Sequence, residues 1–124
     1  MIEKEISFNS GGEHLAGALC IPHDGGRFPC VLMIHGSGQV DRDENTPHSK
    51  LDIFNTIAHH IAGNGVASLR YDKRGCGRSG SVFDKAGFYD LVQDGMAAYR
   101  YLTAQSSIDK DSIFVLGHSE GSMI

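Results

Sequence analysis

Three short, nearly unbroken apolar runs, separated by helical patterns, constrain the fold of this chain more than any other feature. The runs are Cys30–Ile34, Val66–Leu69 and Ile113–Leu116. Runs of this length without polar alternation are typical of strands that are buried on both faces, as in a parallel sheet. Strand, helix, strand, helix and strand in this order predict an α/β fold whose parallel strands are joined by right-handed crossovers.

The segments between these runs carry apolar residues at helical spacing. One face of the first segment is formed by Ile53, Phe54, Ile57, Ala58 and Ile61, and Gly63 to Gly65 supplies the stop. One face of the second is formed by Phe88, Leu91, Val92, Tyr99 and Leu102. Spacing of three and four residues is typical of a helix that packs on a core. We therefore expect helices that flank a mostly parallel sheet.

The first 22 residues have a different, alternating pattern. Ile6 and Phe8 alternate with Glu5 and Ser7, and Leu15, Leu19 and Ile21 alternate again beyond the turn sequence Asn9-Ser10-Gly11-Gly12. Two alternating runs around such a turn predict an antiparallel hairpin over residues 2–22. The 124 residues contain neither an internal repeat nor a linker, so residues 1–124 are expected to belong to a single domain.

Composition excludes several classes of function. The net charge is −4 and the basic residues are scattered, which argues against nucleic acid as a partner. No apolar run approaches the roughly 20 residues of a membrane helix, and the start does not have the pattern of a secretory signal. The cysteines Cys20, Cys30 and Cys76 are odd in number and have no CxxC spacing. This predicts a cytoplasmic setting, with Cys30 as a buried thiol.

The strongest chemical motif is Gly117-His118-Ser119-Glu120-Gly121, which matches G-x-S-x-G. It follows an apolar strand and begins a helical pattern, the context in which this motif forms a nucleophile elbow. The serine sits in a sharp turn, so Gly117 and Gly121 must be small, and the helix N-terminus that follows can stabilise an oxyanion. The alternative is that Ser119 merely caps a helix.

A second motif, His35-Gly36-Ser37-Gly38, directly follows the Cys30–Ile34 strand. Such a loop can bring a backbone N–H opposite the N–H of Glu120, and the two would form an oxyanion hole. The alternative is an ordinary flexible loop. For His35 we expect a structural hydrogen bond to nearby backbone and no role as the general base. Parallel strands present their ligands at their carboxyl ends, so the segments that begin at His35, Asp72 and Gly117 should meet at one edge.

A third motif, residues 72–79, reads Asp-x-Arg-Gly-x-Gly-x-Ser, and Asp41-Arg42-Asp43-Glu44 follows the first glycine-rich loop. With His-Gly-x-Gly before it and Gly-His-Ser-x-Gly after it, the chain resembles the α/β-hydrolase superfamily, in particular bacterial esterase-like and S9-peptidase-like serine hydrolases. The resemblance implies that Ser119 is the nucleophile and that Ser37 and Glu120 contribute backbone amides. It implies a loop-bracing role for Asp72 and Arg74. The expected substrates are small acyl compounds (esters or thioesters) or short peptides.

The triad acid and histidine of that family would follow the serine, but only residues 120–124 follow Ser119 here, and every histidine stands at or before position 118. We therefore expect the N-terminal part of a truncated α/β-hydrolase domain, cut just after the elbow and inactive alone, because a serine without a base is a weak nucleophile. The alternative is a non-catalytic fragment or half-domain that associates with a partner half. Self-association through an exposed sheet edge is also expected.

Three further patterns favour neither a cofactor nor a metal. The G-x-G-x-x-G stretch 75–80 is separated from its helix by residues 81–87, unlike a dinucleotide site. The acidic stretch from Asp41 to Asn45 opens like a calcium loop but lacks the later glycine and glutamate, so we interpret it as a solvated acidic loop. His59 and His60 are adjacent on a predicted helix and point about 100° apart, which suits a surface pair.

Overall fold

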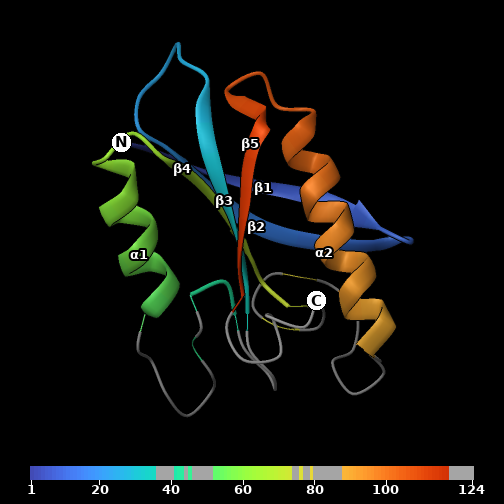
Figure 1. Cartoon of the computed structure of the whole chain (residues 1–124). Coiled ribbons are helices and arrows are strands. Elements are labelled where there is room, and N and C mark those ends of the chain that lie inside the picture. The colour runs from blue at the N-terminus through green and yellow to red at the C-terminus, as the bar shows by residue number, and fades with distance from the viewer. Residues whose placement is uncertain are drawn as a thin grey trace.

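A computed structural model of the chain describes residues 1–35, 41–43, 45, 52–73, 76, 79 and 88–117. The described strands are β1 (Ile2–Ser10), β2 (Glu13–Ile21), β3 (Phe28–Ile34), β4 (Ala67–Tyr71) and β5 (Ile108–Gly117), and the helices are α1 (Ile53–Ala62) and α2 (Phe88–Thr103). The strands form one mixed sheet in the order β1-β2-β4-β3-β5 (Figure 1). The α/β fold and both predicted helices are confirmed.

The N-terminal hairpin is confirmed over its whole length. β1 and β2 pair antiparallel from Ile2 opposite Ile21 to Ser10 opposite Glu13. Gly11 and Gly12 connect them with φ angles of 55° and 89°, a conformation that residues with a side chain rarely adopt. β2 then pairs antiparallel with β4, so the hairpin extends the central sheet.

β3 is the centre of the parallel part of the sheet. It pairs with β4 on one side and with β5 on the other, in both cases parallel. The α1 and α2 helices lie on opposite sides of this sheet, as Figure 1 shows. Neither helix in the described part of the chain combines the length and hydropathy needed to cross a membrane.

Side chains of β3 alternate between two apolar cores, one on each face. Leu32 and Ile34 join the larger core, beneath α2. Met33 points to the other face and packs with Phe54 and Ala58 of α1. Because consecutive strand residues face opposite ways, an unbroken apolar run supplies both cores at once. The prediction that Cys30–Ile34 is buried on both faces is confirmed.

The buried face of α2 differs in part from the predicted one. Leu91 and Leu102 are buried as expected, but Tyr99 is 43% exposed. The buried set includes Asp94, a carboxylate that apolar periodicity could not identify. The Ser10 hydroxyl donates a hydrogen bond of 2.7 Å to Asp94 Oδ1. A buried carboxylate that is hydrogen-bonded avoids much of the cost of desolvation, which explains how a polar residue fits on this face.

The burial on both faces that is typical of such runs is not found at Ile113–Leu116, which instead forms the exposed sheet edge that was expected of this chain. Phe114 and Val115 are 60% and 59% exposed, and Leu116 is 37% exposed. The reason is the position of β5, which is the last strand of the described sheet and pairs there with β3 alone. An edge strand has fewer neighbours to cover its side chains than a central strand.

We predict that Gly17→Ala destabilises the fold. Gly17 of β2 lies opposite Tyr71 of β4, and a Cβ at this position would come within 2.6 Å of the Arg70 carbonyl oxygen. A backbone atom cannot move aside cheaply, so the free energy of unfolding should fall by about 1–3 kcal/mol. Urea denaturation followed by circular dichroism would measure it.

Gly63→Ala is the matched control for this substitution. Gly63 has a φ of −65° at the end of α1, and its Cβ would meet nothing closer than a carbonyl oxygen at 3.4 Å. Its effect should stay within about 0.5 kcal/mol. Equal urea midpoints for the two variants would show that β2 and β4 can separate to admit a methyl group.

Candidate active site

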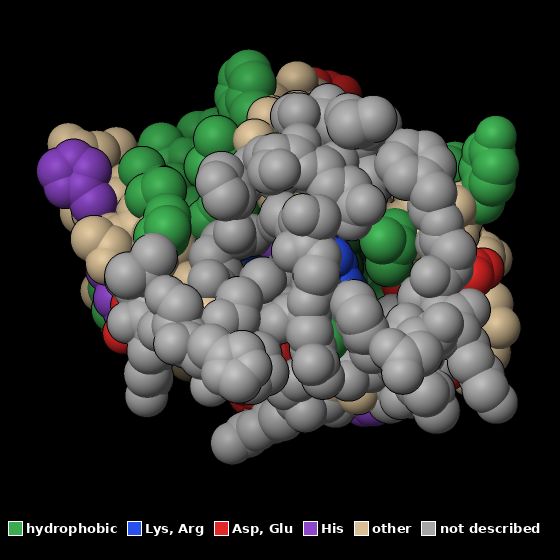
Figure 2. All heavy atoms as spheres, turned by 90° about the horizontal axis from the view of Figure 1, so that it is seen from below, with side chains coloured by type: hydrophobic (Ala, Val, Ile, Leu, Met, Phe, Trp, Pro, Cys, Tyr) green, Lys and Arg blue, Asp and Glu red, His purple; other side chains and the backbone are tan. Residues whose placement is uncertain are grey.

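The carboxyl ends of β3, β4 and β5 lie at one edge of the sheet, at the lower side of Figure 1. These strands end at Ile34, Tyr71 and Gly117. The three segments that were expected to meet at one edge therefore do begin there. Figure 2 looks onto this end of the molecule and shows described hydrophobic side chains along its margins.

Of the predicted site residues, the structure describes Gly117, the last residue of β5. The others lie outside the described residues: Gly36, Ser37, Gly38, Ser119, Glu120 and Gly121. What the structure does establish is where the chain enters those segments. Ile34 and Gly117 are register partners, and neighbouring strands lie about 4.8 Å apart. The two glycine-rich segments therefore leave the sheet side by side.

His35, at the end of β3, is 2% exposed. Its ring packs edge-on against Tyr71, with ring centroids 4.8 Å apart. The expected hydrogen bond to nearby backbone is not found, because neither ring nitrogen has a hydrogen-bond partner among the described residues. Burial, assisted by the charge of Lys73, lowers the pKa of His35 to about 3. The imidazole is therefore neutral at physiological pH and contributes an uncharged polar group at the end of β3.

Asp72, directly after β4, binds the segment that follows β3. Its carboxylate accepts hydrogen bonds from the Arg42 backbone N–H at 2.8 Å and from Arg42 Nε and Nη2 at 3.2 and 3.0 Å. The Asp72 side chain is almost completely buried. Charge-assisted bonds in such a setting hold a loop more firmly than neutral ones. These contacts agree with the bracing role that was expected of Asp72, whereas Arg74 lies outside the described residues.

Ser79, the last residue of the third motif, ties that motif to the hairpin. Its hydroxyl donates to the Asp72 carbonyl oxygen at 2.6 Å and accepts from the Ala16 N–H at 3.0 Å. The Asp72 N–H in turn donates to the Ala16 carbonyl oxygen at 2.8 Å. Residue-based reasoning did not assign this role, although the fixed serine in the motif was the available signal.

Glu3 and Arg70 form a second charged contact on the α1 face of the sheet. Arg70 Nη2 donates to Glu3 Oε1 at 2.6 Å, and Arg70 Nε donates to Asp43 Oδ1 at 2.6 Å. Burial acts to raise the pKa of Glu3, but hydrogen bonds from Arg70 and His59 outweigh it and hold this pKa below its ordinary value. These partners were not predicted, because they come from distant parts of the chain.

The side chains of Asp41, Asp43 and Asn45 in the acidic stretch form hydrogen bonds with other protein groups. Asp41 Oδ1 accepts the N–H groups of Asp43 and Asn45 at 2.9 and 3.0 Å, and the Asn45 amide donates to Asp52 at 2.7 Å. The interpretation as a solvated loop is wrong for Asp43, whose side chain is 18% exposed and paired with Arg70. Across the described ranges, no group of three or more His, Cys, Asp or Glu side chains is arranged to hold a metal ion.

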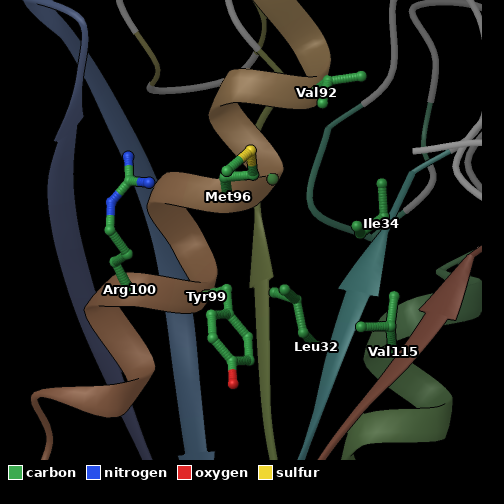
Figure 3. Close-up of a pocket in the computed structure, with 8 residues that line it drawn as sticks. Leu32, Ile34, Val92, Met96, Tyr99, Arg100 and Val115 are labelled. Atoms are coloured by element: carbon green, nitrogen blue, oxygen red, sulfur yellow. The ribbon is translucent and has the colours of Figure 1, made fainter.

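An apolar pocket of about 260 Å³ lies on the α2 face of the sheet and reaches the end of β3 at Ile34. Its walls come from α2, β3 and β5: Leu32, Ile34, Val92, Gly95, Met96, Tyr99, Arg100 and Val115 (Figure 3). Arg100 is the charged member of this lining. Among the described residues, His35, Asp72 and Gly117 do not line it, whereas Ile34, the residue before His35, does.

We predict that His35 makes stability fall on acidification. Folded His35 stays neutral down to about pH 3, whereas the unfolded chain binds a proton near the ordinary pKa of 6.5. Between these values the unfolded state holds more protons, so the unfolding equilibrium constant should rise by up to about tenfold per pH unit as pH falls. In wild type the urea midpoint should therefore fall as pH is lowered from 6.5 to about 3, and in His35→Gln this dependence on pH should be weaker. The exposed His60→Gln is the control, and identical slopes in wild type and His35→Gln would refute the prediction.

The chain is similar in sequence to known hydrolases. Residues 47–124 match the family described as serine aminopeptidase, S33. Over 122 residues the chain is 33% identical to Esterase EstD of Thermotoga maritima, a match that covers 98% of this chain and 28% of that protein. The region matched to the family includes α1, β4, α2 and β5, together with the G-x-S-x-G motif at 117–121.

Solved structures share the fold. The α/β-hydrolase GrgF from Penicillium sp. sh18 has a TM-score of 0.80 at 21% identity, over 98% of this chain and 39% of that one. Est1E from Butyrivibrio proteoclasticus, solved with ferulic acid bound, has a TM-score of 0.78 at 23% identity, over 95% and 44%. The chain thus spans less than half the length of these relatives. The α/β fold, the order of its motifs and the match over residues 47–124 together show that the chain belongs to the serine aminopeptidase S33 family of α/β-hydrolases.

Proposed function

We propose that this chain supplies the nucleophile and the oxyanion hole of a serine hydrolase that cleaves acyl esters of small molecules. The observation that carries the proposal is the pairing of Ile34 with Gly117, from which the Ser37 and Ser119 segments leave the sheet side by side. Similarity to a protein named an esterase favours ester substrates. The family description favours peptides, so short peptides are the second substrate class.

In the proposed reaction, the Ser119 hydroxyl oxygen attacks the acyl carbon and a histidine base takes its proton. The carbonyl oxygen becomes an oxyanion, which accepts hydrogen bonds from the backbone N–H groups of Ser37 and Glu120. Collapse of this tetrahedral intermediate expels the alcohol, which receives the proton from the histidine. Water then attacks the acyl-serine by the same steps and releases the acid. The base and its acid partner are expected in the part of the relatives that this chain does not cover.

The buried cysteines support a reducing, cytoplasmic setting for this enzyme. Cys20 and Cys30 are free thiols, and burial raises the pKa of Cys30 to about 12. A buried thiol with a raised pKa is poorly reactive and does not depend on an oxidising compartment. Cell fractionation should recover the protein in the cytoplasmic fraction, and recovery from the medium would contradict this.

We expect the product of the complete reading frame to react covalently with a fluorophosphonate probe at Ser119. Ser119→Ala should abolish labelling, because the probe requires an activated serine oxygen. The 124-residue chain should label poorly because it lacks a base after the serine. Mass spectrometry of the labelled peptide identifies the site, and Ser122→Ala is the control in the same peptide. Strong labelling of the short chain would show that the base lies within it.

A second candidate function is that of a half-domain that associates through β5. Phe114 and Val115 are both well exposed and point to opposite faces, so β5 presents apolar surface on each side. Val115 also lines the pocket beside α2, where Met96 is 56% exposed (Figure 3). Apolar side chains on an edge strand favour pairing with another chain. We propose that the isolated chain self-associates through this edge.

Self-association of the 124-residue chain should respond to a charge on β5. We expect sedimentation velocity to show species larger than the monomer, at a level that rises with concentration. Val115→Lys should shift the chain toward monomer, because a lysine in the interface would have to be desolvated. His60→Lys introduces the same residue at an exposed position of α1 and should leave association unchanged. A strictly monomeric wild type with a sharp, concentration-independent thermal transition would refute this candidate.

A further inference from the structure

Two carboxylates of β1 bind residues from other parts of the chain: Glu5 binds Arg42, which follows β3, and Glu3 binds Arg70 of β4. Glu5 accepts hydrogen bonds from both terminal nitrogens of Arg42, at 2.5 and 2.7 Å. Glu3 accepts one from Arg70 at 2.6 Å and contacts His59 Nε2 at 3.1 Å. The paired geometry at Glu5 is the two-bond fork that guanidinium and carboxylate groups form, and it fixes orientation as well as distance.

Small side chains on β2 make these contacts possible. Across the sheet, Glu5 lies opposite Ala18, which lies opposite Arg70 of β4. Residues in register share a face of the sheet, so Ala18 stands between the two charged side chains. Its methyl group is too short to separate them. A larger residue at this position would occupy the space that Glu3, Glu5 and Arg70 use.

Arg42 and Asp43 complete a network of alternating charge. Arg42 binds Glu5 and Asp72, and Asp43 binds Arg70, which also binds Glu3. The side chains of Arg70 and Asp72 are 3% and 4% exposed. Glu3 and Glu5 are 36% and 47% exposed, so salt screens their pairs more, but removing either carboxylate takes one partner from the mostly buried Arg70 or Arg42. The network therefore holds residues 42 and 43 against both β1 and β4.

This network sets one end of the segment that carries Ser37. The segment begins at His35, whose ring is buried at the end of β3, and reaches its next described residues at Asp41 and Arg42. His35 and Arg42 are thus described anchor points on either side of Ser37 in the sequence.

We propose that Glu5 and Arg42 are positioning residues, through which the N-terminal hairpin places the Ser37 amide for oxyanion binding. This inference rests on the proposed serine-hydrolase function. Neither residue touches the substrate in this proposal. Glu5 orients Arg42, and Arg42, held also by Asp72, orients the chain that leads back to Ser37.

Catalysis in the product of the complete reading frame provides the first test, with p-nitrophenyl acetate as substrate. Removal of an oxyanion donor lowers kcat by about 100-fold or more, so displacement of one should lower kcat by about tenfold with KM little changed. We expect this for Arg42→Met and a smaller loss for Glu5→Gln. The double variant should be no worse than Arg42→Met, because both act through one contact. Arg42→Lys should rescue in part, since lysine keeps the charge but not the fork.

Glu13→Gln is the matched control, because Glu13 also lies on the hairpin but forms no ion pair with the described residues. It should leave kcat unchanged. Thermal unfolding of each variant separates positioning from global stability. Unchanged kcat in Arg42→Met, while wild-type turnover requires Ser119, would overturn the positioning role alone. A wild type without turnover that depends on Ser119 would overturn the proposed function.

Amide hydrogen exchange of the 124-residue chain tests the positioning role without catalysis. Peptides that cover residues 36–45 should exchange at least about threefold faster in Glu5→Gln and Arg42→Met, because loss of an anchor increases local opening. Peptides from α2 should exchange as in wild type. Equal exchange of the 36–45 peptides in all variants would overturn the role of the network, whatever the result of the catalytic assays.

Discussion

The pairing of β3 with β4 on one side and β5 on the other is the interaction on which the rest of this structure depends. Both pairs are parallel, so the three strands end at the same edge. Parallel strands need cover on both faces, which α1 and α2 supply, each over a core that includes β3 side chains. The site edge and the two cores are therefore consequences of one set of backbone hydrogen bonds.

The two faces of the sheet are built differently near the hairpin. On the α2 face, β1 and β2 contribute apolar residues such as Phe8 and Leu15 to the larger core. On the α1 face, small residues of β2 leave room for charged side chains of β1 and β4 to meet. The first arrangement gains stability from burial of apolar area. The second contributes orientation, because charge-assisted hydrogen bonds from a guanidinium have a defined geometry.

The site edge combines a neutral buried imidazole with firmly held carboxylates. His35 stays uncharged because burial opposes its protonation, whereas Asp72 carries its charge against Arg42. Ser79 adds neutral hydrogen bonds that join Asp72 to Ala16 of the hairpin. Segments that are distant in the chain are thus fixed together where β3, β4 and β5 end. The proposed reaction requires such a rigid edge of the sheet, since oxyanion donors act only when they are held in place.

Local sequence pattern was sufficient to predict the strands, the helices, the hairpin and the edge at which β3, β4 and β5 end together. Apolar runs, helical spacing and the paired glycines Gly11 and Gly12 act within a few residues, so they can be read along the chain. The burial of Asp94 and the partners of Glu5 were decided by the tertiary structure alone. Each depends on a neighbour from a distant segment: the hydroxyl of Ser10 and the guanidinium of Arg42. The partners of ion pairs and hydrogen bonds depend on proximity in the folded structure, and periodicity along the chain does not predict which distant residues come close.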